Sequence, residues 1–213
     1  MNEARRGIVA EEKKPDAGVA GLLFEVGGLA AILLIVIAEA AYPNFSVHAN
    51  AMSDLSVLKA PTFMLGEAAG LFRAVPWIIG AYYLFRNTGR RGLMALAILP
   101  GVTNLFAVLS PEDVSVVVHS LGAPVTLVTG LIIAYLSYRV VQGPFRYVAM
   151  ALGATSFLSA VVQFAGYTVP AVHGLWTILG PGGWESMSIF PVLLWLVCFG
   201  NYLLTTSRFG EEP

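Results

Sequence analysis

Long apolar stretches separated by short polar connections dominate the sequence and limit its possible folds. A helix needs about 20 predominantly apolar residues to cross the hydrocarbon core of a bilayer. The pattern predicts an all-α fold, a polytopic transmembrane bundle of six helices within residues 18–205, between tails at 1–17 and 206–213. The predicted spans are 18–42, 63–85, 92–109, 114–138, 147–169 and 187–205.

Lys and Arg are distributed unequally among the connections, and this distribution sets the predicted orientation. They gather in both tails and in the connections after the second and fourth spans, whereas the other three connections hold only Lys59. Positive charge near span ends favours the cytoplasmic side. We therefore place both tails in the cytoplasm, in a multi-pass protein of the cell membrane. The first span is predicted to be a retained helix and not a cleaved signal peptide.

Composition and motifs exclude several classes of function. The 12 Lys+Arg and 13 Asp+Glu residues give a net charge of −1, so nucleic acid is not an expected partner. The single cysteine, Cys198, cannot form an internal disulfide or a thiolate cluster. No nucleophile elbow, zinc-protease motif or phosphate-binding loop is present.

A polar, acidic segment separates the third and fourth apolar stretches. Ser110 and Asp113 fit the start of a helix, with Ser110 as its N-cap. Glu112 and His119 would then lie on one face of that helix. Capping does not account for these two residues, which makes them the leading candidates for catalytic groups. The structural alternative is a neutral histidine bonded to the backbone or to a neighbouring span.

Other polar residues are expected at the same outer face. Asp54 and Glu185 are candidate catalytic carboxylates, and Ser53 and Trp184 are candidate substrate contacts. A short helix is expected within residues 43–62, whereas the Gly and Pro residues of 170–185 predict a structured loop. The tryptophans are interpreted in part as residues of the membrane interface.

Arg73 lies near the middle of the second span, where a lone charge is costly. It is therefore expected to face the interior of the bundle. One interpretation is a structural clamp, with Glu39, Glu67 or Asn104 as its partner. The other is the floor of a site that binds an anionic substrate.

Three histidines, His48, His119 and His173, come from separate segments near the outer face. Together with a carboxylate they would offer the kind of donor set that zinc takes in enzymes. A divalent metal such as zinc is therefore one alternative. The other is that the two loop histidines, His48 and His173, are simply solvated.

Several short elements follow one another in a distinctive order. They are Tyr42-Pro43, Met52-Ser53-Asp54-Leu55-Ser56, Ser110-Pro111-Glu112, His119-Ser120, Gly183-Trp184-Glu185-Ser186, Pro191, Trp195 and Gly200. In this order they resemble DUF998, a family of polytopic membrane proteins of unknown function, from about residue 22 to 204. The resemblance implies a six-span bundle with its motifs on one side and implies no particular activity. His48 and His173 fall outside the pattern.

Three functions stay open at this point. The first is a hydrolase or transferase, metal-assisted in one version, that acts on a lipid or another amphiphile. The second is a protein that binds or transports a lipid or a small molecule, although no transport repeat is visible. The third is a structural subunit of a membrane complex. Membrane lipid is an expected partner in each case, and a homo-oligomer is compatible with all three.

Overall fold

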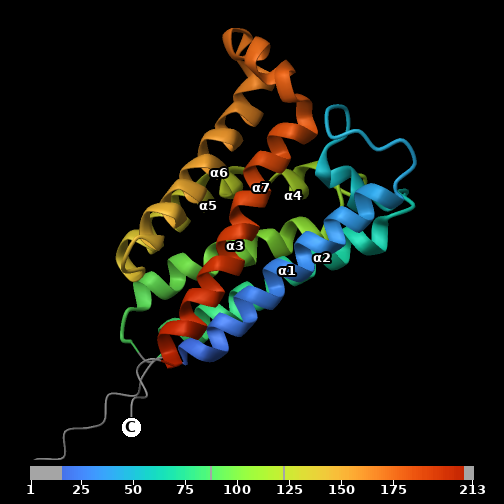
Figure 1. Cartoon of the computed structure of the whole chain (residues 1–213). Helices are drawn as coiled ribbons and strands as arrows, with labels where there is room; N and C mark the ends of the chain where they lie inside the picture. Colours follow the sequence, from blue (N-terminus) through green and yellow to red (C-terminus); the bar gives the residue numbers. More distant parts are fainter. Residues whose placement is uncertain (1–15, 87, 122, 209–213) are drawn as a thin grey trace, which may run out of the picture.

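The computed structural model describes residues 16–86, 88–121 and 123–208, and within them the chain is helical with no strand, as predicted (Figure 1). The helices begin and end close to the edges of the apolar stretches. In chain order they are α1 (Ala17–Ala41), the 3-10 helix η1 (Met52–Ser56), α2 (Phe63–Phe85), α3 (Arg91–Leu109), α4 (Val116–Leu121), α5 (Ala123–Val140), α6 (Phe145–Thr168) and α7 (Pro170–Arg208). The short helix expected within 43–62 is η1.

Five of these helices, α1, α2, α3, α6 and α7, are long and apolar enough to cross a membrane. The fourth predicted span, 114–138, is not one helix but is divided between α4 and α5, and the apolar helix Val128–Val140 is shorter than the other five. Pro124 lies in the first turn of α5, a position that proline favours. In one continuous helix over 114–138 the same proline would lie in the interior and remove a backbone hydrogen bond. A sixth crossing therefore stays a prediction.

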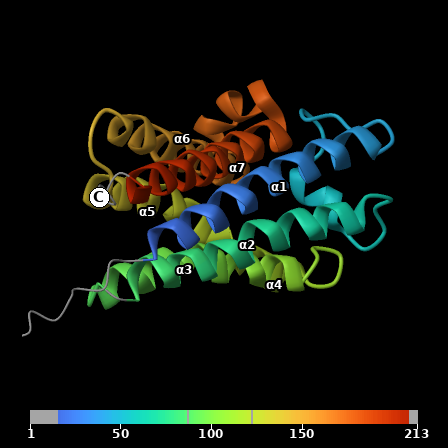
Figure 2. The ribbon, with the colours of Figure 1, turned by 60° about the horizontal axis from the view of Figure 1, so that its bottom comes forward.

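The helices form a curved layer in the order α6, α7, α1, α2, α3 (Figure 2). α5 packs against α6 and also contacts α3, and α4 lies against α3. The start of α1 and the end of α7 lie side by side (Figure 1). Asp16 forms an ion pair with Arg86 at this end and raises the pKa of that guanidinium. The connections after α2 and after α5 lie toward this same end (Figure 1), and its location in the cytoplasm stays a prediction.

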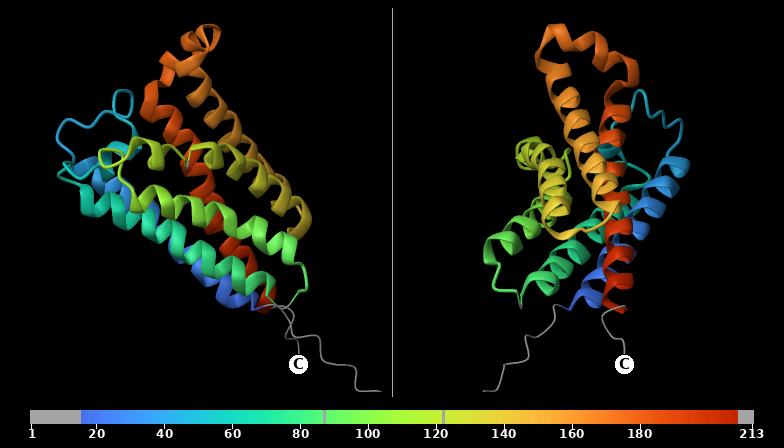
Figure 3. Two further views of the ribbon diagram at one scale, coloured as in Figure 1. Left: turned by 180° about the vertical axis from the view of Figure 1, so that it is seen from behind. Right: turned by 60° about the vertical axis from the view of Figure 1, so that its left-hand side comes forward.

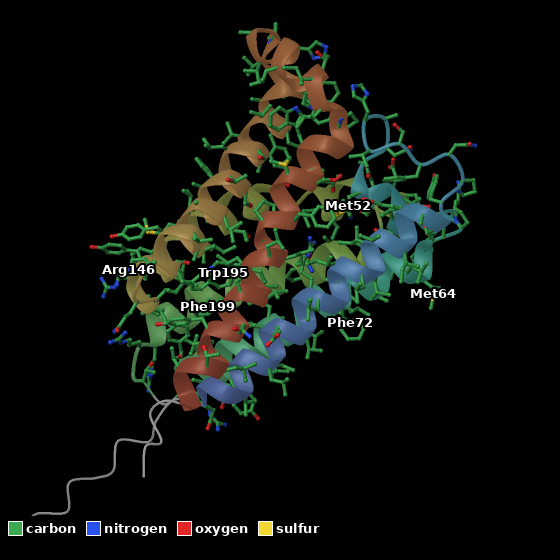
Figure 4. All side chains as sticks on the ribbon, in the orientation of Figure 1. Met52, Met64, Phe72, Arg146, Trp195 and Phe199 are labelled. Atoms are coloured by element: carbon green, nitrogen blue, oxygen red, sulfur yellow. The ribbon has the colours of Figure 1, made fainter. Side chains whose placement is uncertain are left out.

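An aromatic cluster fills the core of the layer. Trp195 stacks on Phe199 with 4.7 Å between ring centroids and lies 5.7 Å from Trp77 (Figure 4). The indole N–H of Trp195 donates to Ser137 Oγ at 2.8 Å, and that of Trp77 donates to the Ala97 carbonyl at 2.8 Å. The interfacial interpretation is therefore wrong for these two tryptophans, whose polar atoms find partners inside the bundle.

The predicted loop at 170–185 is wrong, because α7 already begins at Pro170 and projects beside α6 as a helical hairpin (Figure 3). Only Gly180 leaves the helical conformation, with φ 69° and ψ −178°. Proline favours the first turn of a helix, so Pro170 and Pro181 each start a helical segment. Glycine adopts a positive φ without a steric penalty, and Gly180 forms the bend between the two segments.

Candidate functional site

A cavity of about 390 Å³ lies at the end of the molecule opposite the Arg-rich connections. This volume falls in the range of roughly 300–1,000 Å³ that is usual for small-molecule sites. Side chains from η1 and from all seven α-helices contribute to its lining. Its polar and charged lining residues are Ser53, Ser56, Glu67, Arg73, Thr103, Asn104, Glu112, His119, Thr129, Gln163, Tyr167, Glu185 and Ser188.

The cavity brings together five of the residues predicted to form a site: Ser53, Arg73, Glu112, His119 and Glu185. They come from segments far apart in the sequence, and η1, α2, α4, α7 and the connection between α3 and α4 contribute them to one cavity. The remaining candidates lie elsewhere, and each has a structural role instead.

Asp54 and Trp184 do not line the cavity. Asp54 Oδ2 accepts a hydrogen bond from the Ala51 backbone N–H at 3.0 Å, and from the Asn50 amide at 3.4 Å. The Asp54 carboxylate therefore stabilises the start of η1. The indole N–H of Trp184 donates to the Trp176 carbonyl at 2.9 Å, across the bend in α7.

The three histidines do not form a common site. Ring nitrogens of His48 and His173 lie 3.1 Å from the Thr177 carbonyl and 3.2 Å from the Gly166 carbonyl, and His173 also stacks on Trp176. Among the described residues, no three His, Cys, Asp or Glu side chains are placed to hold a metal ion. The three-histidine alternative is therefore not the arrangement of these residues, because His48, His119 and His173 each bond to a different backbone carbonyl.

His119 is held at the cavity by the end of α3. Its Nδ1 lies 3.1 Å from the carbonyl of Ser110, so this nitrogen carries the proton and donates. Nε2 is then the nitrogen with a free lone pair. Glu67 of α2 lines the same cavity and interacts electrostatically with His119. This arrangement gives His119 the tautomer that a general base requires.

The predicted helix start at Ser110 is wrong. Ser110 ends α3, and α4 begins after Ser115, whose Oγ accepts the Val118 N–H at 3.3 Å. Asp113 is not a helix cap, since its Oδ1 accepts the Leu58 N–H at 3.0 Å. Glu112 thus lies in a turn and not on a helix face shared with His119, although both line the cavity.

Glu185 connects α7 to the segment 43–62. Its Oε2 accepts the backbone N–H of Met52 at 2.7 Å, and the Ser53 N–H also donates to this carboxylate (Met52 is labelled in Figure 4). Together with the bonds of Asp113 and His48, this contact holds the segment over one end of the cavity. Residues 51–53 and 55–56 of the segment form part of the cavity lining.

Arg73 reaches the cavity from α2 without the partners that the sequence suggested. Asn104 donates its amide to the Gly70 carbonyl at 3.0 Å. Within the described part of the chain, no ion pair or hydrogen bond engages the Arg73 guanidinium. Glu185 is the acid whose charge acts on it through space. A clamp formed by direct pairing is therefore not the arrangement of these residues.

Most of the other polar lining residues were not singled out as site candidates from the sequence, and two of them, Glu67 and Gln163, carried a signal there. Glu67 was considered only as a partner of Arg73, although a carboxylate within a span is itself a signal of a functional position. Gln163 lies in α6, and its Oε1 is buried with no hydrogen-bond partner among the described residues. A glutamine inside an apolar stretch was the available signal.

Comparison with known proteins agrees with the order of the short sequence elements. The family model described as "Protein of unknown function (DUF998)" matches residues 26–201, which include every lining residue of the cavity. No curated protein and no solved structure matches the chain. The chain therefore belongs to the DUF998 family.

Proposed function

We propose that this membrane protein binds an amphiphilic or small organic molecule in the cavity, at the side predicted to be extracytoplasmic. The observation that carries the proposal is the mixed lining of one cavity. Apolar side chains such as Leu55, Trp77 and Ile189 offer a surface for hydrocarbon, while Arg73, Glu67 and the other polar residues offer charge and hydrogen bonds. Sites for organic ligands combine these two features.

A variant that fills the cavity tests this proposal. Ala107 lines the cavity from α3, and Ala107→Phe is expected to abolish ligand retention because the larger ring occupies the ligand's volume. Leu109→Phe is the matched control, because Leu109 is 70% exposed on the same helix and does not line the cavity. Native mass spectrometry of the protein released from detergent would identify retained molecules. Equal retention by Ala107→Phe and the wild-type protein would contradict the proposal.

The tautomer of His119 favours a second candidate function, hydrolysis or group transfer on the bound molecule. In this reaction Nε2 would accept the proton of an attacking water or hydroxyl group, and the charge of Glu67 would stabilise the imidazolium that forms. The proposal needs no step through a bound metal. Glu112, which lines the same cavity, is available as a second acid–base group.

His119→Gln separates binding from turnover. Glutamine can still donate to the Ser110 carbonyl but cannot act as a base near neutral pH. Loss of general acid–base catalysis is expected to slow conversion of the bound molecule by about 10²–10⁴-fold, with retention unchanged. The mass of the retained molecule, followed over time, measures both quantities. Conversion at the wild-type rate would rule out a catalytic role for His119.

A further inference from the structure

We infer that the ligand carries an oxyanion, a carboxylate or a phosphate, attached to an apolar chain, and that Arg73 binds this anionic group. The inference rests on the proposed binding function and names the chemical class of the ligand. It starts from the position of Arg73, ten residues after the first residue of α2 and thus about 15 Å along that helix. An arginine at this depth is costly unless an anion compensates its charge.

The acids of the cavity do not supply this compensation by direct contact. Glu185 uses its carboxylate on the backbone N–H groups of Met52 and Ser53. Glu67 lies on the same helix as Arg73 and forms no ion pair with it. Within the described residues no acid lies within ion-pair distance of Arg73, since the one ion pair found there joins Arg86 to Asp16. A positive charge is therefore left facing the cavity.

The geometry of the side chain selects the kind of anion. A guanidinium presents five N–H donors in a planar fork, which matches the two oxygens of a carboxylate or a phosphate. None of these donors is engaged by the described part of the chain. Charge-assisted, two-point contacts of this type are among the stronger hydrogen bonds in proteins.

The surroundings of Arg73 select the rest of the ligand. Trp77 lies one helical turn further along α2 and lines the cavity, as do Pro100 and Val108 of α3. Ile189 of α7 lines the cavity as well. These side chains form an apolar wall continuous with the charged site. A free inorganic anion would leave this wall unoccupied, so a chain-bearing oxyanion uses more of the cavity.

The test compares ligands that differ in the head group. Wild-type protein in phosphatidylcholine nanodiscs would be titrated with dodecanoate, dodecyl phosphate and dodecanol, and separately with acetate and inorganic phosphate. Binding would be measured by native mass spectrometry and by the shift in Tm. The two anionic amphiphiles are expected to bind at least tenfold more tightly than dodecanol. If acetate or inorganic phosphate saturates the site with the same affinity as the anionic amphiphiles, the ligand is a soluble anion and needs no apolar chain.

Variants then locate the effect. Arg73→Gln is expected to lower the affinity for both anionic amphiphiles to that for dodecanol. Arg73→Lys is expected to keep part of the preference for anionic head groups, because lysine retains the positive charge but not the planar set of N–H donors. Arg91→Gln is the control for a loss of charge, because Arg91 is exposed at the start of α3. Dodecanol binding by Arg73→Gln shows that the cavity is intact in that variant.

The outcomes separate the inference from the function on which it rests. If the wild-type protein binds dodecanol as tightly as dodecanoate, and Ala107→Phe does not bind dodecanol, the role of Arg73 is overturned and the binding function stands. An anion preference unchanged in Arg73→Gln would also overturn it. Failure of every amphiphile to bind, or binding that Ala107→Phe does not reduce, would overturn the proposed function itself.

Discussion

Glu185→Leu is expected to lower the free energy of unfolding by about 2–6 kcal/mol, because two backbone N–H groups lose their acceptor and each unsatisfied group costs about 1–3 kcal/mol. The two groups belong to Met52 and Ser53, at the start of η1. Leucine has a similar size and accepts no hydrogen bond. The same change should therefore detach the segment 43–62 from α7 while leaving the packing of α7 in place.

A site-specific cleavage assay would measure this detachment. Lys59 is the only Lys or Arg in the segment 43–62, so tryptic cleavage after it reports opening of this segment. Cleavage is expected to be faster in Glu185→Leu and intermediate in Glu185→Gln, which keeps one acceptor oxygen. Glu112→Gln removes an equal charge at the same end and is expected to be cleaved at the wild-type rate. Unchanged cleavage in Glu185→Leu would show that Asp113 and His48 alone hold the segment.

The spans could be predicted from the sequence because the requirement for apolar length acts on each helix by itself. α2 matches its predicted bounds, 63–85, at both ends, whereas α1 is displaced by one residue at each end and α3 begins one residue earlier than predicted. Predictions failed where Gly and Pro were interpreted one at a time. In 170–185 the prolines that suggested a loop start two helical segments, and Gly180 forms the bend between them. This bend lies against the backbone of the segment 43–62, a contact that the local sequence does not reveal.

The site was predictable to the extent that burying charge in a membrane is costly. Arg73 was identified on that ground and Glu185 from its position in an outer connection, and both line the cavity. Asp54, His48 and His173 were grouped with them because topology places them at the same end of the bundle. Sharing an end does not bring side chains within bonding distance, and each of these three is fixed by a backbone group nearer to it.

Gly182→Ala is expected to destabilise the protein by about 3 kcal/mol or more, the upper end of the usual cost of overpacking. A Cβ at this position would lie 1.8 Å from the Asn50 carbonyl oxygen and 2.6 Å from that of Val47. Both obstacles are backbone atoms, so no side-chain rotation can relieve the clash. The segment 43–62 would have to move away from α7, and the cavity would lose part of its lining.

The same substitution elsewhere in α7 is expected to have the opposite sign. Gly174 is exposed, and a Cβ added there would meet nothing within 4 Å. Gly174→Ala should therefore gain up to about 1 kcal/mol from the higher helix propensity of alanine. Thermal unfolding in one detergent would compare the two variants with the wild-type protein, and cleavage at Lys59 would be faster in Gly182→Ala alone. A Gly182→Ala protein as stable as Gly174→Ala would mean that the segment 43–62 does not pack against the bend of α7, and the cavity would then lack the wall that the segment provides.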